Sequence, residues 1–379
     1  MKKKLLSMLV VGTLSLTSLV GCGSKQSDNE ILIGGIGPLT GDASSYGTSV
    51  KNGAELFLDE YNSNGGFDGK KIKLLFEDDE ADATKALNAY DKLVNKEEVS
   101  MIFGAVTSGS STAIADRAKS DQIPMISPTA TEPNITKKGG EYVFRGCYID
   151  SLQGETLSKY ASEDLKAKKA SILYNVSSDY SKGIAETFKK KFEAAGGEVV
   201  SFDSYNSGDK DFSAQLTKVK NLNPDILVLP DYYDTVGLIT DQARSAGITA
   251  QFLGGDGWDS PKLFEIGGDS VEGAIFVNHY SPEDESADVQ KFVKAYKEKY
   301  NTDPDAFAAL SYSTLQVLTK AIESAGSTDA EAVKDALAKT DLNTITGHIT
   351  FDKNRNPIKS VSVIKIQDGK QTLVKKINP

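Results

Sequence analysis

The chain has 379 residues, a quarter of them charged, and a formal net charge of −10 at neutral pH. This acidic balance argues against nucleic acid as a partner, because nucleic-acid phosphates are bound by basic surfaces. The length exceeds what one hydrophobic core usually holds and predicts two domains. After the first 22 residues no segment approaches the roughly 18 uninterrupted apolar residues that predict a membrane span.

The first residues have the pattern of a secretory signal. Lys2, Lys3 and Lys4 precede an apolar run over 5–20, which is shorter than the roughly 20 residues needed to cross a bilayer. The run ends in LVGC, which resembles a bacterial lipobox with Cys22 as the lipidated residue. The prediction is a signal peptide over 1–21 and a lipid anchor on the extracytoplasmic face of the cell membrane. The alternative is an ordinary signal peptide that happens to contain a cysteine.

Cleavage before Cys22 changes the bulk properties of the chain. It removes three lysines and makes the formal charge −13. The polar stretch over 22–30 is typical of a flexible tether. With Cys22 lipidated, Cys147 is the only other cysteine, so no disulfide within the chain is expected.

From residue 31 to 148, short β-branched runs alternate with amphipathic helices, which predicts βαβ units, a parallel sheet and right-handed crossovers. The same alternation begins again near 149, which predicts a second, similar lobe. A late helical block indicates that the chain then crosses back between the lobes. The predicted strands are 31–36, 71–77, 99–103, 123–126, 170–174, 198–202, 225–229, 251–253, 345–351 and 360–367. The predicted helices are 46–64, 82–95, 111–120, 151–166, 180–195, 211–221, 233–246, 286–300, 306–325 and 329–338.

The loops that follow the predicted strands carry the candidate site, because ligands of open parallel sheets bind beyond the carboxyl ends of the strands. In the first lobe these loops, 34–47, 104–111 and 127–133, are rich in Gly, Ser and Thr. Hydroxyls and free amides at helix starts hold a carboxylate without a cation. In the second lobe, 231–233 and 254–258 supply tyrosines, a tryptophan and Asp256, which is suited to an ammonium group. This inventory suits a zwitterion.

Eight short motifs now define a resemblance. They are 33–41 (IGGIGPLTG) with 46–47 (YG), 62–66 (NSNGG), 78–79 (DD), 126–131 (ISPTAT), 179–183 (DYSKG), 210–212 (KDF), 242–247 (QARSAG) and 252–257 (FLGGDG). Over essentially all of the mature sequence, the chain resembles the type I periplasmic solute-binding proteins of the branched-chain amino acid family. It lacks the first-lobe disulfide of some relatives, which is peripheral to ligand chemistry.

The resemblance implies the roles of individual residues. Ser108 would hold the ligand carboxylate through its amide and hydroxyl, and Asp256, where many relatives carry Glu, would pair with the ammonium group. A further pair of contacts falls within Thr129, Ala130 and Thr131, in a register that the sequence leaves open. Trp258 is either pocket wall or lobe packing. The remaining aromatic contacts implied by the resemblance are Tyr46, Tyr180, Tyr232 and Phe307.

The resemblance also implies an architecture and a function. The fold is α/β, with two Rossmann-like lobes built on parallel central sheets and joined by a three-strand hinge. The first lobe would combine 31–148 with 279–345, and the second 149–278 with 346–379. A monomer without cofactor would capture a branched-chain or similar aliphatic or aromatic amino acid and deliver it to the permease of an ABC importer.

Four alternatives compete with this interpretation. The acidic run over 77–82 would suit calcium, although a solvated strand end beside a helix start explains it better. Gly35 and Gly37 follow a strand, but the third glycine of a dinucleotide-binding motif is missing. An enzyme would need a coherent catalytic group, whereas the chain has only His279 and His348 and no hydrolase, metalloprotease or CxxC motif. A ligand-sensing module for an amide or carboxylate would share the fold and the site.

Overall fold

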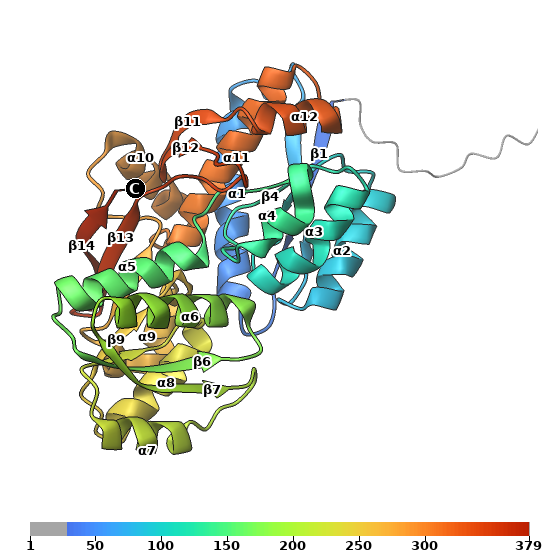
Figure 1. Cartoon of the computed structure of the whole chain (residues 1–379). Helices are drawn as coiled ribbons and strands as arrows, with labels where there is room; N and C mark the ends of the chain where they lie inside the picture. Colours follow the sequence, from blue (N-terminus) through green and yellow to red (C-terminus); the bar gives the residue numbers. More distant parts are fainter. Residues whose placement is uncertain (1–28, 379) are drawn as a thin grey trace, which may run out of the picture.

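The computed structural model describes residues 29–378 (Figure 1). The signal sequence, Cys22 and nearly all of the tether lie outside the described residues. Two lobes follow each other along the chain, and the orange helices of the C-terminal third lie against the blue first lobe. No helix within the described part combines the length and apolar character needed to cross a membrane.

The first lobe is built on a parallel five-stranded sheet with the order β2-β1-β3-β4-β5. Strand β1 (Glu30–Gly37) runs through its interior and is buried over its last five residues. It has apolar residues and glycines on both faces because helices cover both sides of the sheet. The other strands are β2 (Lys71–Asp78), β3 (Ile102–Gly104), β4 (Met125–Ser127) and β5 (Val143–Arg145).

Helices from two distant parts of the chain complete the first lobe. Helix α1 (Ser44–Ser63) packs along α11 (Ala306–Ala325). The two backbones touch at Gly53, where a Cβ atom would lie 2.2 Å from the carbonyl oxygen of Ala308. Only glycine permits this approach, which fixes the C-terminal helices onto the N-terminal lobe. The other helices are α2 (Ala83–Asn95), α3 (Ser108–Ser120), α4 (Asn134–Gly139), α10 (Ala287–Tyr300) and α12 (Ala330–Leu337).

The second lobe has a seven-stranded sheet with the order β14-β13-β10-β9-β8-β6-β7. Strands β6 to β10 pair in parallel, as predicted for the central sheet, whereas β13 pairs antiparallel with both of its neighbours, β10 and β14. Asp368 and Gly369 join β13 to β14 with φ angles of 53° and 68°, the pattern of a tight hairpin turn, which makes β14 run antiparallel to β13. The strands are β6 (Lys169–Asn175), β7 (Glu198–Tyr205), β8 (Ile226–Val228), β9 (Gln251–Gly254), β10 (Ile275–Asn278), β13 (Val361–Gln367) and β14 (Lys370–Ile377).

Five helices and two short 3-10 turns accompany this second sheet, and a third such turn lies in the first lobe. Helices α5 and α6 pack against each other in front of it (Figure 1). The Ser178 hydroxyl caps α6 by accepting from the Ser181 amide at 3.3 Å. The helices are α5 (Asp150–Glu163), α6 (Asp179–Ala194), α7 (Ser213–Leu222), α8 (Tyr233–Ser245) and α9 (Pro261–Gly267). The turns are η1 (Gly140–Tyr142) in the first lobe, and η2 (Asp256–Trp258) and η3 (Gly268–Val271) in the second.

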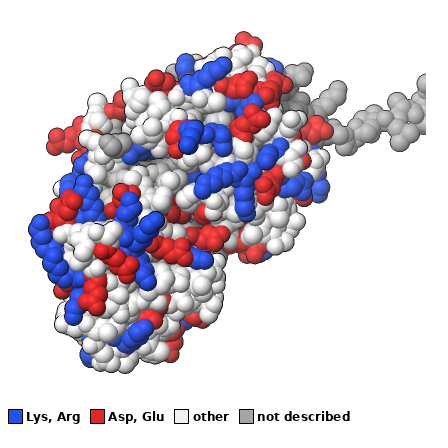
Figure 2. Space-filling model, viewed as in Figure 1, with Lys and Arg blue, Asp and Glu red and all other residues white. Residues whose placement is uncertain are grey.

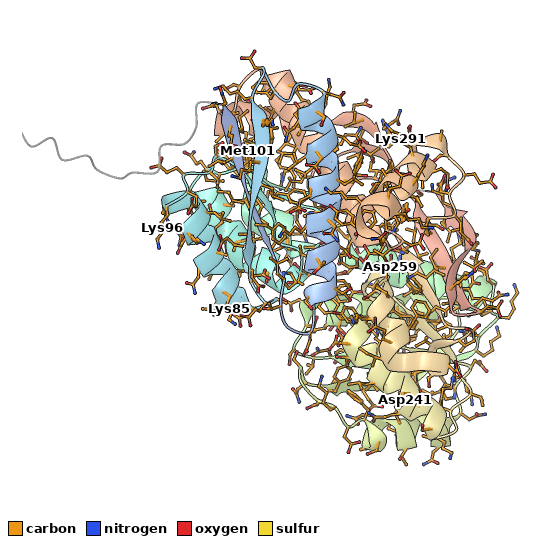
Figure 3. The ribbon with its side chains drawn as sticks, turned by 180° about the vertical axis from the view of Figure 1, so that it is seen from behind. Lys85, Lys96, Met101, Asp241, Asp259 and Lys291 are labelled. Atoms are coloured by element: carbon orange, nitrogen blue, oxygen red, sulfur yellow. The ribbon has the colours of Figure 1, made fainter. Side chains whose placement is uncertain are left out.

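Three chain segments connect the lobes. They lie between β5 and α5, between β10 and α10, and between α12 and β13. The third contains a small hairpin of β11 (Asp341–Thr344) and β12 (Gly347–Thr350), and the predicted lobe boundary at 345 falls in its turn. Seen from behind, Asp259 lies close to the meeting of the lobes (Figure 3). It accepts from the Ala306 amide at 2.7 Å and so joins η2 to the start of α11.

The predicted helices are all present, with ends within about three residues of those observed. The unpredicted elements are α4, α9, β5, β10, β11 and β14. Most of them span only three to seven residues, too short for a periodic pattern to stand out from a loop.

On the surface, acidic and basic side chains are interspersed over the face seen in Figure 2.

Candidate ligand-binding site

The carboxyl ends of the central strands of both sheets point toward the contact between the lobes. The loops that follow them enclose a small cavity there. About 10 Å³ of this cavity is open to the centre of a water molecule, roughly the room that one water needs. The cavity is lined by Tyr46, Val106, Thr107, Ser108, Thr129, Thr131, Tyr180, Tyr232, Asp256, Gly257 and Phe307.

The first lobe presents hydroxyls and amides to this cavity. Ser108 is the first residue of the 13-residue helix α3, where backbone amides have no partner within the helix. The Ser108 hydroxyl accepts from the Glu132 amide at 3.3 Å, and the Thr129 hydroxyl donates to the Val106 carbonyl at 2.7 Å. No Lys or Arg lines the cavity within the described part of the chain. This face suits an anion held by neutral donors.

Four aromatic rings form one wall. Tyr46 stacks on Phe307 with ring centroids 4.2 Å apart, and Tyr232 lies between Tyr46 and Tyr180 at 5.3 and 5.1 Å. Burial raises the pKa of Tyr46 and of Tyr180 well above the ordinary value. Their hydroxyls therefore stay protonated and can donate hydrogen bonds.

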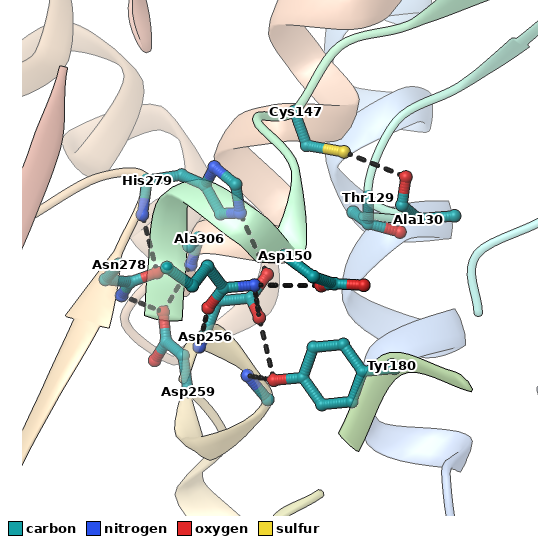
Figure 4. Close-up of polar contacts among 12 residues, drawn as sticks. Thr129, Ala130, Cys147, Asp150, Tyr180, Asp256, Asp259, Asn278, His279 and Ala306 are labelled. Carbon is teal, nitrogen blue, oxygen red and sulfur yellow. Dashed lines mark hydrogen bonds and ion pairs between the residues drawn. The ribbon is translucent and has the colours of Figure 1, made fainter. Parts of the chain in front are cut away.

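Asp256, 4% exposed, is the only charged side chain among the lining residues. Its Oδ1 atom accepts from Gln153 Nε2 and from the Tyr180 hydroxyl, each at 2.9 Å, and its Oδ2 atom is 2.8 Å from His279 Nε2 (Figure 4). A Cβ atom at Gly255 would lie 2.8 Å from both the Gln153 Oε1 atom and the Tyr180 hydroxyl. The glycines beside Asp256 thus let the donors reach it.

Direct hydrogen bonds hold the two lobes together across the cavity. The Tyr46 hydroxyl donates to the Gly257 carbonyl. Ser45 Oγ lies 2.8 Å from Ser260 Oγ. Farther out, the Tyr233 hydroxyl donates to the Asp42 carbonyl at 2.5 Å. The lobes are therefore in contact, and the cavity as it stands is too small for an amino acid.

A wider polar cleft of about 530 Å³ adjoins the cavity and shares Thr107 and Tyr232 with it. Among the described residues its lining includes no Lys or Arg. This approach to the site carries negative charge and disfavours anionic ligands. Its carboxylates are Asp42, Glu80, Asp179, Asp231 and Asp234.

Two of the predicted site residues do not line the cavity. Trp258 is fully buried in the core of the second lobe, where its Nε1 atom donates to the Leu229 carbonyl at 3.0 Å and its ring faces Phe276. Its interpretation as pocket wall gives way to lobe packing. Ala130 lies behind the surface, and its amide is not available to donate to a ligand because it already donates to Ser127 Oγ at 3.1 Å.

Sequence reasoning missed the residues that hold Asp256 from behind. Gln153 lies in α5, 103 residues earlier in the chain. His279 follows β10, a strand that the sequence did not predict. The one available signal was that both lie close to predicted lobe boundaries, Gln153 near 148/149 and His279 at 278/279. The lining residues Val106 and Thr107 were visible in the loop after β3 but were not singled out.

The acidic run over 77–82 is engaged by groups of the protein itself. Glu77 pairs with Lys92 at 2.7 Å. The Asp82 side chain caps α2 by accepting from the Lys85 amide at 2.9 Å. Within residues 29–378 no three His, Cys, Asp or Glu side chains are arranged to hold a metal ion. These carboxylates therefore act as local hydrogen-bond and ion-pair partners.

Cys147 has the environment of a structural thiol. It is buried and its Sγ atom donates to the Ala130 carbonyl at 3.2 Å. Burial raises its pKa to about 12, so the nucleophilic thiolate is not formed at neutral pH.

Several known proteins are similar to this chain over most of its length. A family model described as periplasmic binding protein matches residues 30–371. "Leu/Ile/Val-binding protein BraC3" of Rhizobium johnstonii is 36% identical over 90% of this chain and 93% of its own length. "Leu/Ile/Val-binding protein homolog 3" of Brucella melitensis is 33% identical over 90% of this chain and 92% of its own.

Two solved structures are similar over 92% of the chain. A leucine-binding protein LivK from Thermotoga maritima is 39% identical with a TM-score of 0.88 and is covered over 99% of its length. LivJ, a branched-chain amino acid transporter substrate-binding protein from Streptococcus pneumoniae in complex with isoleucine, is 35% identical with a TM-score of 0.88 and is covered over 100% of its length. The chain belongs to the periplasmic binding protein family of solute-binding proteins, with the two-lobed α/β fold that its sequence predicts.

Proposed function

We propose that this chain captures a branched-chain amino acid between its lobes outside the cytoplasm and delivers it to the permease of an ABC importer. The observation that carries the proposal is the pairing, across one cavity, of neutral donors at the start of α3 with the buried carboxylate of Asp256. The names and ligands of the relatives point to the same class of solute.

The two charged ends of the ligand would be held on opposite faces. Its carboxylate would bind the amide and hydroxyl of Ser108, with further hydrogen bonds from Thr129 or Thr131. Its ammonium group would bind Asp256, the only carboxylate among the lining residues. Opposite ends held on opposite lobes explain why one ligand would bridge the cleft.

The aliphatic side chain would lie against the aromatic wall. Tyr46, Tyr232 and Phe307 offer apolar surface, and the hydroxyl of Tyr46 is occupied by the Gly257 carbonyl. Burying a Leu, Ile or Val side chain there would contribute roughly 1.5–3 kcal/mol. A second carboxylate on the ligand would meet the acidic cleft outside, so aspartate and glutamate are expected to bind poorly.

Binding would require the lobes to separate. We assign the moving bodies as 31–148 with 279–345, and 149–278 with 346–379, which would rotate about the three connecting segments. The ligand would dock on the first lobe, and closure would bring Tyr180 and Asp256 onto it. The permease would distinguish the closed form from the open one.

The proposal also covers the cellular location, the oligomeric state and the activity of the protein. Cleavage before Cys22 and lipidation of that residue would tether a monomer to the extracytoplasmic face of a bacterial membrane. The protein would carry no enzymatic activity and need no cofactor. Buried Cys147 supports the first point, since it offers no reactive thiolate.

Isothermal titration calorimetry tests the proposal. The chain from residue 24, refolded to remove ligand carried through purification, is titrated with the twenty amino acids and with benzoate as a carboxylate that lacks an amine. Micromolar or tighter binding of leucine, isoleucine or valine is the expected result. Binding of another amino acid would change the specificity and keep the mechanism. Binding of benzoate alone would overturn the role of Asp256.

A further inference from the structure

The carboxylate of Asp256 is held by its two oxygens in different ways. Gln153 and Tyr180 share Oδ1, whereas among the described residues His279 alone is bonded to Oδ2, at 2.8 Å (Figure 4). A carboxylate has about four acceptor positions, so three donors leave room for one more. The direction of that remaining position depends on the donor at Oδ2.

The imidazole of His279 is fixed in place. The residue is 4% exposed and directly follows β10, where the chain leaves the second lobe. Its amide donates to Asn278 Oδ1 at 2.9 Å. Its ring lies on the ring of Tyr148 with centroids 3.5 Å apart. His279 and Tyr148 thus stand on two of the segments that connect the lobes, directly behind the candidate site.

The hydrogen-bond geometry determines the protonation of the ring. Asp256 Oδ2 accepts, so Nε2 carries the hydrogen. Nδ1 is buried and has no partner within residues 29–378. A second proton would therefore bury an N–H group without an acceptor, which is costly. These contacts favour the neutral Nε2–H tautomer of the ring.

The surroundings of the ring shift the pKa of His279 in opposite directions. Burial is the main influence that lowers the pKa of His279, the hydrogen bond and charge of Asp256 raise it, and the charge of Lys359 lowers it. Lys359 belongs to the third connecting segment, and its amine is bonded to the Gly146 carbonyl and the Thr346 hydroxyl. No further charge lies in direct contact with the ring among the described residues.

We propose that His279 is a positioning residue for the ligand ammonium: its neutral imidazole fixes the Oδ2 atom of Asp256 from behind without cancelling the carboxylate charge. A cationic donor in this place would neutralise Asp256 and weaken its attraction for an ammonium group, whereas a neutral donor leaves the charge for the ligand. This inference rests on the proposed function, because it assumes a ligand with an amino group.

The protein itself offers a direct spectroscopic test, since the chain contains only two histidines. In protein labelled with ¹⁵N-histidine, long-range ¹H–¹⁵N correlation spectra report the tautomer of each ring. We expect His279 as the Nε2–H tautomer at neutral pH and an Nε2 shift that moves when isoleucine is added. His348 is exposed and paired with Asp341 at 2.8 Å, so its signals serve as the internal reference. A protonated or Nδ1–H ring at position 279 overturns the inference.

Variants separate the donor from the bulk of the ring. His279→Leu removes the donor, and we expect isoleucine to bind about tenfold more weakly by calorimetry. His279→Gln supplies a neutral N–H donor and is expected to remain within about threefold of the parent protein. His348→Gln is the matched control and should bind as the parent does. Equal losses for Leu and Gln, or no loss for Leu, overturn the inference.

The outcomes also separate the two proposals. If the parent protein binds no amino compound, the proposed function and the inference both fail. If the parent binds isoleucine and the tautomer or the variants disagree, only the inference fails. The spectroscopic arm needs no variant, so a failure of His279→Leu to fold leaves the test intact.

Discussion

The two faces of the cleft are built on different principles. The first-lobe face offers hydroxyls and the free amides at the start of α3, and none of its cavity-lining residues is charged within the described chain. The second-lobe face carries the carboxylate of Asp256, held by Gln153, Tyr180 and His279. The first-lobe face therefore offers the ligand neutral hydrogen-bond donors. The second-lobe face offers one negative charge, whose position is fixed by three hydrogen bonds.

This difference determines how strongly a single substitution on each face should weaken ligand binding. Ser108 and Thr129 already bond to groups of their own lobe, so each contributes one neutral interaction among several. On the second face the charge of Asp256 has no substitute. Hydrogen bonds to charged groups are worth about 1.5–3 kcal/mol, and neutral ones about 0.5–1.5 kcal/mol. Changes on the second face should consequently weaken binding more than changes on the first.

The largest effect is expected for Asp256→Asn. The amide has nearly the same shape but no charge for an ammonium group, and its NH₂ would face donors. We expect isoleucine affinity to fall by about 30-fold or more, which corresponds to about 2 kcal/mol. Calorimetry measures the affinity, and thermal unfolding of the variant checks that the fold is retained. Unchanged affinity would mean that the charge of Asp256 plays no part in binding.

Tyr180→Phe should have a smaller effect on the same face. The Tyr180 hydroxyl donates to Asp256 Oδ1 and accepts from the Gly257 amide, both at 2.9 Å. Gln153 still holds Oδ1 in the variant, so the charge remains but is less well oriented. We expect roughly tenfold weaker isoleucine binding by calorimetry. A loss as large as that of Asp256→Asn would indicate that the hydroxyl contacts the ligand itself.

Ser108→Ala probes the opposite face. The hydroxyl is lost while the backbone amide at the start of α3 remains, so the carboxylate keeps part of its site. We expect a roughly threefold to fivefold loss of isoleucine affinity, about 1 kcal/mol or less. The same titration measures it. A loss greater than that of Tyr180→Phe would reverse the ranking of the two faces.

The smallest effect on binding is expected for Lys359→Met, a change at a buried charge outside both faces. Lys359 is 4% exposed and does not line the cavity. Isoleucine affinity should stay within about twofold. The consequence should appear in stability instead, because burial lowers the pKa of this lysine to about 7, from an ordinary value of 10.5.

The sign of that stability effect follows from proton binding. Between about pH 7 and 10.5 the unfolded chain keeps a proton on Lys359 that the folded chain releases. The contribution of this group to the unfolding free energy of the parent protein therefore increases as the pH rises through this window. The stability of Lys359→Met relative to the parent should fall from pH 6.5 to pH 9 in urea unfolding. Lys353→Met, at an exposed position in the same segment, should show no such trend.

Much of the fold could be predicted from the sequence because its signals are local. The amphipathic pattern of α2 and the apolar run of β1 are contained in consecutive residues. The loops after the strands could also be predicted, and eight of the predicted site residues line the cavity. Strand β10 has only four residues and strand β14 has no buried residue, so neither gave a clear periodic pattern.

What only the tertiary structure decided is which distant residues share one polar group. Asp256 is bonded to Gln153, 103 positions away, and to His279, at the start of a segment that connects the lobes. Trp258, two residues from Asp256, points instead into the core toward Leu229. Periodicity determines which face of an element is apolar, and so the sequence by itself determined two α/β lobes with a site at their strand ends. The orientation of a side chain beyond a strand end depends on how the sheets and connecting segments meet, and no local pattern encodes that.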